Sequence, residues 1–362
     1  MKSTFKRAAV VTATSALAIG ALAGCSSSSD SGDDSTSGSG DAVKIGLLLP
    51  ESSTTRYETF DKPFITADLQ ELGDYDIVYS NADQDADKQQ QQAEAAIAQG
   101  VKVLILDPVD ADAAASIVSE ASAAGIPVVS YDRLISSSDL AFYVSFDNEQ
   151  VGVLQAQTLL DGLSAEGETS GGLIMINGSP TDSNATAFKE GAHSVLDDSG
   201  LDLLAEYDTP DWSPDKAQAW MEQQVTKYAG EFVAVYAAND GTAGGAIAAM
   251  QSAGIDPWPI VTGQDAELAG IQRIVAGEQY MTVYKSIKQE AQAAAEAADA
   301  LAQGTTPEGQ SDDTDGVPTT LLTPVAVTID NIMDTVVADG FWSVDDICTA
   351  DYADACTAAG IQ

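Results

Sequence analysis

The feature that most constrains the fold of this chain is a regular alternation of two kinds of segment. From Val43 onward, short runs rich in Val, Ile and Leu recur, and an amphipathic or Ala-rich stretch follows each one. Continuous apolar strands separated by helices are typical of parallel sheets that helices cover on both faces. Ten runs are too many for one small sheet, so we predict an α/β fold of two doubly wound parallel-sheet lobes. The ten runs are VKIGLLL, DIVYS, VKVLILD, IPVVSYD, AFYVSFD, GGLIMIN, LDLLAEYD, FVAVYAAND, PIVTGQD and MTVYK.

The charge of the chain limits its partners. Its 362 residues contain 15 Lys and Arg against 56 Asp and Glu, a formal net charge of -41. Binding a nucleic acid needs clustered basic residues, and no such cluster follows the first seven residues, so no nucleic-acid partner is expected. Because 44% of the residues are hydrophobic, the acidity indicates the surface of a folded protein rather than disorder. Charge of this size also favours a monomer.

The N-terminal segment has the pattern of a targeting signal. Three basic residues precede an apolar run, and its end, LAGC at residues 22–25, resembles the bacterial lipobox, in which the Cys is lipidated. A transmembrane anchor is the alternative, but the run Ala8–Gly24 is short for a span. Residues 26–42 are rich in Ser, Gly and Asp and are predicted to form a flexible tether. We therefore expect an extracytoplasmic protein, lipid-anchored through Cys25 to the outer face of the cell membrane.

Few residues are available for metal binding or catalysis. Cys348 and Cys356 lie eight residues apart, and outside the cytoplasm they are expected to form a small disulfide, since a metal site needs more ligands than two thiols. His193 is the only histidine, which excludes an HExxH metalloprotease and disfavours a Ser-His-Asp triad. The chain also lacks a GxxxxGK[ST] phosphate loop. We therefore predict no catalytic residues, no metal and no cofactor.

Polar and aromatic side chains gather where the predicted strands end. In an open parallel sheet, ligands bind beyond the carboxyl ends of the strands. An Asp there is also a common helix cap, and a Trp fits a core position, so each residue taken alone has a structural alternative. As a set, seven strand ends predict one ligand-binding rim. Its members are Arg56, Tyr57, Asp132, Arg133, Asp182, Asn184, Trp212, Asn239, Asp265 and Lys285.

The chemistry of this rim suits a neutral polyol. Carboxylates and amides accept hydrogen bonds from hydroxyls, whereas Arg and Lys donate to them. Flat aromatic rings such as Tyr57 and Trp212 pack on the C–H faces of a pyranose. An anionic ligand would call for cations without so many acceptors, and an apolar ligand would not account for the charges.

Six longer runs carry a more specific signal. They are YDRLI (131–135), FYVSFDNEQVGVLQAQ (142–157), GSPTDSNA (178–185), ANDGTAGGAI (238–247), GQDAELAGIQRIVAGEQYMTVYK (263–285) and LLTPVAV (321–327). These runs resemble those of the bacterial xylose-binding proteins, which are sugar receptors of ABC importers within the type I periplasmic binding protein superfamily. The likeness extends over residues 43–342.

This resemblance implies two α/β lobes joined by three hinge strands, which close on one monosaccharide, with D-xylose favoured, and deliver it to ABC permease subunits. Trp212 would stack on the sugar ring. The expected segments are a signal at 1–25, a tether at 26–42, an N-terminal lobe at 43–147 plus 286–318, a C-terminal lobe at 148–285 plus 319–345, and an extension at 346–362. The implied hydrogen-bonding residues are Arg56, Asp132, Arg133, Asp182, Asn184, Asn239, Asp265 and Lys285.

Two parts of the chain depart from the family pattern. Tyr57 falls where the xylose-binding pattern has a tryptophan, and the stretch 50–62 around it matches poorly. One aromatic wall of the pocket is therefore altered, although it is still aromatic. The C-terminal piece with Cys348 and Cys356 has no counterpart in the pattern.

Three other functions fit parts of the pattern. Multi-sugar binding proteins, for glucose, arabinose or galactose, share several of the same runs. A sensory receptor that reports the sugar to a membrane signalling partner would have the same binding chemistry. A glycosidase would need two carboxylates, such as Asp132 and Asp182, as acid and nucleophile. The glycosidase is disfavoured, because nothing in the sequence indicates that one of these carboxylates stays protonated.

Overall fold

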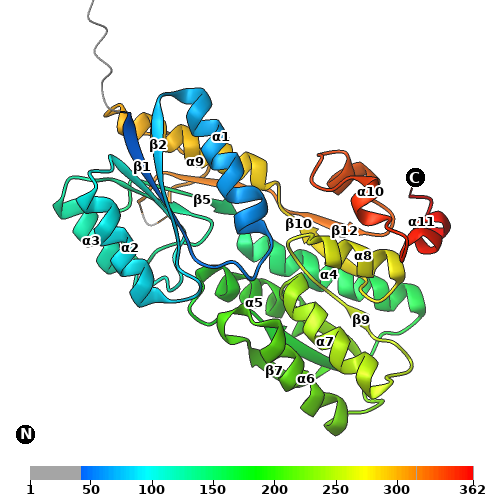
Figure 1. The fold of residues 1–362 in the computed structure, drawn as a ribbon. Helices are drawn as coiled ribbons and strands as arrows, with labels where there is room; N and C mark the ends of the chain where they lie inside the picture. The colour runs from blue at the N-terminus through cyan, green and yellow to red at the C-terminus, as the bar shows by residue number, and fades with distance from the viewer. Residues whose placement is uncertain (1–41, 315, 362) are drawn as a thin grey trace, which may run out of the picture. The chain divides into compact units, whose positions relative to one another are not determined.

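The computed structural model describes residues 42–314 and 316–361. The predicted signal, the lipidation site Cys25 and the tether up to residue 41 lie outside the described residues. Among the described residues, the strands form a six-stranded sheet, a four-stranded sheet and a two-stranded ribbon (Figure 1). These elements make up two lobes, which we call lobe 1 and lobe 2.

Lobe 1 is built on the six-stranded parallel sheet, in the order β11-β5-β4-β3-β1-β2. Successive side chains of a strand point to opposite faces, so Ile45 and Leu47 pack with α1 and α9, whereas Leu48 packs with α2 and α3. Both faces of the sheet are therefore buried. The elements are β1 (Val43–Leu49), η1 (Tyr57–Asp61), α1 (Lys62–Leu72), β2 (Tyr75–Asn81), α2 (Ala86–Ala98), β3 (Val103–Leu106), α3 (Ala115–Ala123), β4 (Val128–Tyr131), β5 (Phe142–Phe146), α9 (Ile287–Ala302) and β11 (Thr319–Leu322).

Lobe 2 is built on the four-stranded parallel sheet, in the order β7-β6-β8-β9. Side chains of α4 and α5 cover one face and those of α6 and α7 the other. The elements are α4 (Asn148–Glu166), β6 (Gly171–Asn177), α5 (Ser183–Leu196), β7 (Leu201–Asp208), η2 (Pro210–Trp212), α6 (Pro214–Lys227), β8 (Phe232–Ala237), α7 (Asp240–Ala253), β9 (Ile260–Val261), α8 (Leu268–Ala276), β10 (Met281–Tyr284), β12 (Val325–Thr328), η3 (Met333–Val337), α10 (Val344–Ile347) and α11 (Ala353–Ala359).

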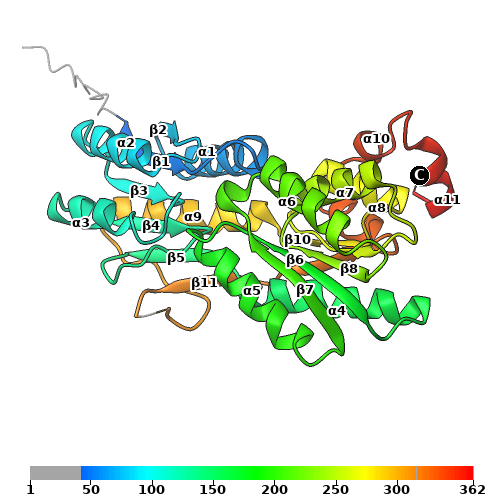
Figure 2. The same ribbon diagram turned by 90° about the horizontal axis from the view of Figure 1, so that it is seen from below.

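The chain passes between the lobes three times: from β5 to α4, from β10 to α9, and from β11 to β12. Figure 2 shows β11 and α9 beside the strands of lobe 1, and β10 on the side of lobe 2. The returning strand β12 pairs antiparallel with β10, because it enters lobe 2 in the opposite direction. All other pairs among the named strands are parallel, which confirms the predicted fold class.

One expected lobe boundary needs correction. The sequence places residues 319–345 in the C-terminal lobe, but β11 pairs with β5 from Thr319 to Leu322 and so extends the sheet of lobe 1. The backbone of β5 would otherwise be an unpaired sheet edge. We therefore propose that the chain crosses from lobe 1 to lobe 2 for the last time after Leu322. The other two proposed lobe boundaries stay where the sequence predicts them, after residues 147 and 285.

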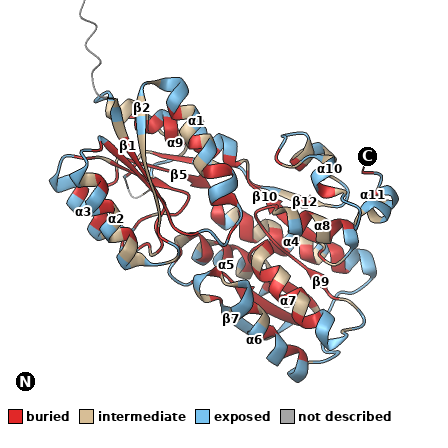
Figure 3. Cartoon of the chain, in the orientation of Figure 1, coloured by how far each residue is buried: buried red, intermediate tan, exposed pale blue. Residues whose placement is uncertain are grey.

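Local sequence signals account for the helix ends. The side chains of Asp147, Asp182 and Asn239 each accept a hydrogen bond from a backbone N–H in the first turn of the following helix. Gly167 and Gly254 adopt left-handed conformations just after α4 and α7, as helix C-termini require. Figure 3 shows that burial follows the two sheets and the inner faces of these helices.

Two features are absent from residues 42–314 and 316–361. None of the helices there combines the length and apolar character needed to span a bilayer. No group of three or more His, Cys, Asp or Glu side chains there is placed to hold a metal ion. His193 instead contacts Asp197 and Glu206 at the surface, at 2.8 and 3.0 Å.

Candidate ligand-binding site

A small cavity of about 20 Å³, counted as the space open to the centre of a water molecule, lies between the two lobes. Its lining residues follow the carboxyl ends of strands from both sheets. The structure brings all ten expected site residues together around this cavity. Thr54, Phe188 and Gln264 line it as well.

Arg56 is the centre of a buried charge cluster in lobe 1. Its guanidinium contacts three carboxylates: Asp61 at 2.7 Å, Asp132 at 3.0 Å and Glu290 at 2.6 Å. Arg56 is 3% exposed, and the three acids are buried as well. The hydroxyl of Tyr131 also donates to Asp61. One cation thus holds together residues from η1, β4 and α9, and presents Asp132 to the cavity.

Two of the carboxylates around Arg56, those of Asp132 and Glu290, have pKa values shifted in opposite directions. Burial alone would raise the pKa of Asp132, but Arg56, Lys285 and Arg133 outweigh it and lower this pKa to about 2. Burial raises the pKa of Glu290 to about 8, because Arg56 offsets it only in part. Arg56 therefore favours the ionised, hydrogen-bond-accepting form of Asp132, whereas burial favours the protonated form of Glu290.

The raised pKa of Glu290 predicts that the stability of the fold depends on pH. A carboxylate whose pKa rises from 4.5 to about 8 on folding binds more protons in the native state between these values, so its contribution to stability is lost as pH rises through about 8. We expect the melting temperature to fall between pH 5 and pH 8, and to fall less in Glu290→Gln, whose amide stays neutral. Thermal unfolding of both proteins over this range is the measurement, and an equal fall in both would contradict the assignment.

Arg133 is the second cation of the cavity, and it contacts residues of both lobes. Its Nη2 donates to the Tyr57 hydroxyl at 3.0 Å, and its Nη1 to the carbonyl of Pro108 at 3.1 Å. Its Nε lies 2.9 Å from Asp182 Oδ2 in lobe 2, as an ion pair without hydrogen-bond alignment. Asp107 lies 3.5 Å from the same Nε, and burial raises its pKa well above the ordinary value.

Asp182 and Asn184 position the neighbouring groups in lobe 2. Asp182 caps α5 through the backbone N–H of Asn184 at 2.8 Å, and its other oxygen accepts from the Trp212 indole at 2.8 Å. Asn184 donates to Asp132 of lobe 1 at 3.2 Å. Burial raises the pKa of Asp182, although Arg133 opposes this effect.

The third cation of the cavity is Lys285. Its Nζ lies 3.2 Å from Asp265 Oδ1, and 5.5 and 5.8 Å from the ring centroids of Phe146 and Phe188. Asn239 completes this side: its Oδ1 caps α7 by accepting from Thr242 N at 2.8 Å, and the cap does not use its amide nitrogen. Each cation of the cavity is therefore paired with a carboxylate.

Three site residues have unfavourable backbone conformations. Asp132, Trp212 and Asp265 have φ angles of 57°, 54° and 93°, in the region that non-glycine residues rarely adopt. Gly178 makes room for Trp212, because a Cβ at this glycine would lie 2.0 Å from the indole ring. Strain of about 1–3 kcal/mol per residue persists only where the surroundings enforce it, and such residues cluster at binding sites.

The cavity also contains residues that the sequence reasoning missed. Phe188 adds a third aromatic side chain near Tyr57 and Trp212, but in the sequence it resembles a core residue of an amphipathic helix. Gln264 is 2% exposed, and the oxygen of its side-chain amide, Oε1, has no hydrogen-bond partner among the described residues. Gln264 lies directly before Asp265 at the end of a predicted strand, and this position in the sequence indicates a place at the rim of the site.

The lobes contact each other around the rim of the cavity. Ala111 N of lobe 1 donates to Thr181 O of lobe 2 at 3.0 Å. Thr55 N donates to Glu267 Oε1 at 3.2 Å, and Gln84 reaches the carbonyl of Asp211 at 3.2 Å. These bonds require both lobes in their present positions, so the structure is a closed conformation. Two lobes closed over a polar cavity define the class of a binding protein.

Comparisons with known proteins agree with this class. Residues 45–306 match the periplasmic binding protein domain. The D-xylose-binding periplasmic protein of Escherichia coli K12 is 40% identical over 83% of this chain and 91% of its own length. The protein of the same name from Haemophilus influenzae is 38% identical over 91% of this chain and 96% of its own. A carbohydrate transporter solute-binding protein of Chloroflexus aurantiacus, solved with D-glucose, is 32% identical, with a TM-score of 0.76 over 83% of this chain and 97% of that one.

The chain belongs to the type I periplasmic binding protein family, in the branch that contains the D-xylose-binding proteins. This confirms the family that the sequence motifs predict. Members of the family are extracytoplasmic binding components of transporters, so this chain is a binding protein and not an enzyme.

Proposed function

We propose that this protein binds one neutral monosaccharide between its lobes, with D-xylose as the first candidate, and delivers it to an ABC permease. The observation that carries the proposal is the cavity lining, in which three cations are neutralised by buried carboxylates and aromatic rings stand beside them. The 40% identical relative that is named a D-xylose-binding protein supports this choice of sugar.

The proposed binding residues suit hydroxyl groups in both directions. A sugar hydroxyl donates to Asp132, Asp182 or Asp265 and accepts from an Arg, Lys or Asn N–H. Hydrogen bonds to ionised groups are the stronger kind, and the ion pairs within one lobe, Arg56–Asp132 and Lys285–Asp265, hold these groups in place before the sugar arrives. Trp212 offers an aromatic face to the C–H groups of the ring, with Tyr57 and Phe188 as further walls.

Hinge closure is the proposed mechanism of capture. The sugar first binds one lobe of an open form, and rotation about the three crossings brings Asp132 and Arg133 of lobe 1 against Asp182 and Asn184 of lobe 2. The sugar favours the closed form because only that form supplies both sets of contacts. The permease would then recognise the two lobes in their closed arrangement.

The place of action follows from the N-terminal sequence. We propose that Cys25 is lipidated and that residues 26–42 tether the binding domain to the outer face of the cell membrane. The lipobox-like LAGC sequence supports this anchor.

A hexose is the second candidate. The solved relative from Chloroflexus aurantiacus holds D-glucose, and its fold superimposes on this chain with a TM-score of 0.76. Tyr57 also stands where the xylose-binding pattern has a larger tryptophan, which leaves more room beside the ring. A multi-sugar specificity would follow if that room admits a hydroxymethyl group.

Calorimetric titration with D-xylose and D-glucose tests the proposal. The mature, unlipidated protein is unfolded and refolded first, so that any copurified sugar is removed. We expect one-to-one binding of D-xylose and weaker binding of D-glucose. Equal binding of both sugars would favour the multi-sugar alternative, whereas binding of neither, nor of arabinose or galactose, would refute a monosaccharide receptor.

A further inference from the structure

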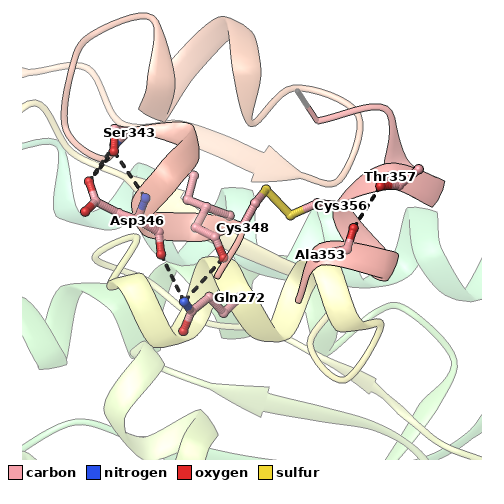
Figure 4. Close-up of a disulfide and its surroundings, with 8 residues drawn as sticks. Gln272, Ser343, Asp346, Cys348, Ala353, Cys356 and Thr357 are labelled. Carbon is pink, nitrogen blue, oxygen red and sulfur yellow. Dashed lines mark hydrogen bonds between the residues drawn. A yellow bond between two sulfur atoms is a disulfide. The ribbon is translucent and has the colours of Figure 1, made fainter. Parts of the chain in front are cut away.

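The C-terminal segment forms a small clip on lobe 2, which we define as residues 341–361. Ser343 begins α10 with a capping box, and a disulfide joins Cys348 to Cys356 (Figure 4). Gln272 of α8 donates to the carbonyls of Asp346 and Ile347, at 3.2 and 3.3 Å. The clip is therefore fixed to α8 by hydrogen bonds as well as by its buried side chains.

One side chain of the clip reaches the backbone beside the cavity. Trp342 Nε1 donates to the carbonyl of Ala266 at 2.8 Å. Ala266 directly follows Asp265, and the two residues have φ angles of 48° and 93°. Two consecutive non-glycine residues in this region are costly, so the turn needs fixed partners.

The remaining partners of this turn come from β10. Asp265 N donates to Val283 O at 2.9 Å, and Ala266 N donates to Thr282 Oγ1 at 3.1 Å. These bonds hold the amide side of the turn, whereas Trp342 holds the carbonyl of Ala266. Loss of the indole bond would free one side of the turn that points the Asp265 carboxylate toward Lys285.

The clip also contacts the part of lobe 1 that carries Arg56 and Tyr57. Phe60 lies in the same short helix as Tyr57, and its ring stacks on Phe341 with centroids 4.1 Å apart. Phe60 also meets the Trp342 ring edge-on at 5.1 Å. The clip therefore contacts segments that carry site residues in both lobes.

We propose that Trp342 is a positioning residue for ligand binding, which acts through the Asp265–Ala266 turn and is itself held by the disulfide-closed clip. This proposal rests on the proposed sugar-binding function. It assigns a role to the extension that begins at residue 346 and has no counterpart in the family pattern. It also makes sugar affinity depend on residues that do not line the cavity.

Trp342→Phe is the first test, because it keeps the aromatic contacts and removes the N–H. We expect about a threefold to tenfold loss of sugar affinity, the usual effect of one hydrogen bond. Trp258→Phe is the matched control: Trp258 also donates its indole N–H to a backbone carbonyl of lobe 2, that of Glu278 at 2.9 Å, but away from the cavity. It should lower the melting temperature to a similar extent and leave the affinity unchanged.

A double-mutant cycle separates positioning from general loss of stability. If Trp342 acts through Asp265, Trp342→Phe should weaken binding by less than about twofold in an Asp265→Asn background. Additive effects, or an unchanged affinity in Trp342→Phe alone, would overturn the proposal. Failure of the wild-type protein to bind any of the four sugars would instead refute the proposed function.

A second variant covers the case in which Trp342→Phe does not fold. The Cys348→Ser/Cys356→Ser protein releases the clip without altering Trp342, and we expect about a twofold to fivefold loss of affinity, again absent in the Asp265→Asn background. Full affinity in this disulfide-free protein would overturn the role of the clip.

Discussion

Arg56→Met is expected to lower the free energy of unfolding by about 3–5 kcal/mol, because removing one partner of a buried ion pair leaves the others uncompensated. Asp61 and Asp132 would then lose the guanidinium that contacts both. The corresponding fall in melting temperature is about 6–20 °C for a domain of this size. Urea and thermal unfolding followed by circular dichroism measure both quantities.

Lys62→Met is the control for this prediction. Lys62 forms an ion pair with Glu58 at 3.1 Å, but both side chains are well exposed, and such pairs contribute less than about 1 kcal/mol. Similar unfolding energies for Arg56→Met and Lys62→Met would show that the buried cluster does not stabilise the fold.

Asp265→Asn is expected to weaken sugar binding by about 5- to 150-fold, since a buried group that loses its charged partner costs about 1–3 kcal/mol. The substitution preserves size and, because Asn tolerates positive φ as well as Asp does, it preserves the turn. It removes the charge that neutralises Lys285, so the ammonium group must be buried with a weaker partner. Calorimetric titration with the sugar that the wild-type protein binds gives the ratio of affinities.

Asp202→Asn provides the matched control for Asp265→Asn. Asp202 lies on β7 in the same lobe and is exposed, so its substitution should leave the affinity unchanged. An Asp265→Asn protein that binds as tightly as Asp202→Asn would remove Asp265 from the proposed site.

The fold class and the position of the cavity could be predicted because both depend on local patterns. Apolar runs separated by amphipathic segments specify a parallel sheet, and the residue after each run must then lie at its carboxyl edge. Asp132 and Asp265 were found in this way, although nothing in their sequence shows the positive φ that the tertiary structure imposes on them.

The partners of the predicted residues could not be found by the same reasoning. Glu290 lies in a helix rich in Ala and Gln, where a charged residue normally faces solvent, yet packing of α9 on lobe 1 buries it against Arg56. Asp107 directly follows β3, but its contact with Arg133 joins distant parts of the sequence and leaves no local pattern. β11 has only four residues, so its assignment to lobe 1 depends on pairing with β5, which is a long-range contact.

The neutralised cations also determine which sugar derivatives the proposed receptor binds poorly. A sugar phosphate or a uronic acid would bring a negative charge to Arg56, Arg133 and Lys285, each of which already has a buried carboxylate beside it. The anion would lose its hydration and meet those carboxylates at close range, without a free positive charge in return. Phosphorylated and oxidised sugars in the surroundings of the cell would therefore compete poorly with the free sugar, even where they are more abundant.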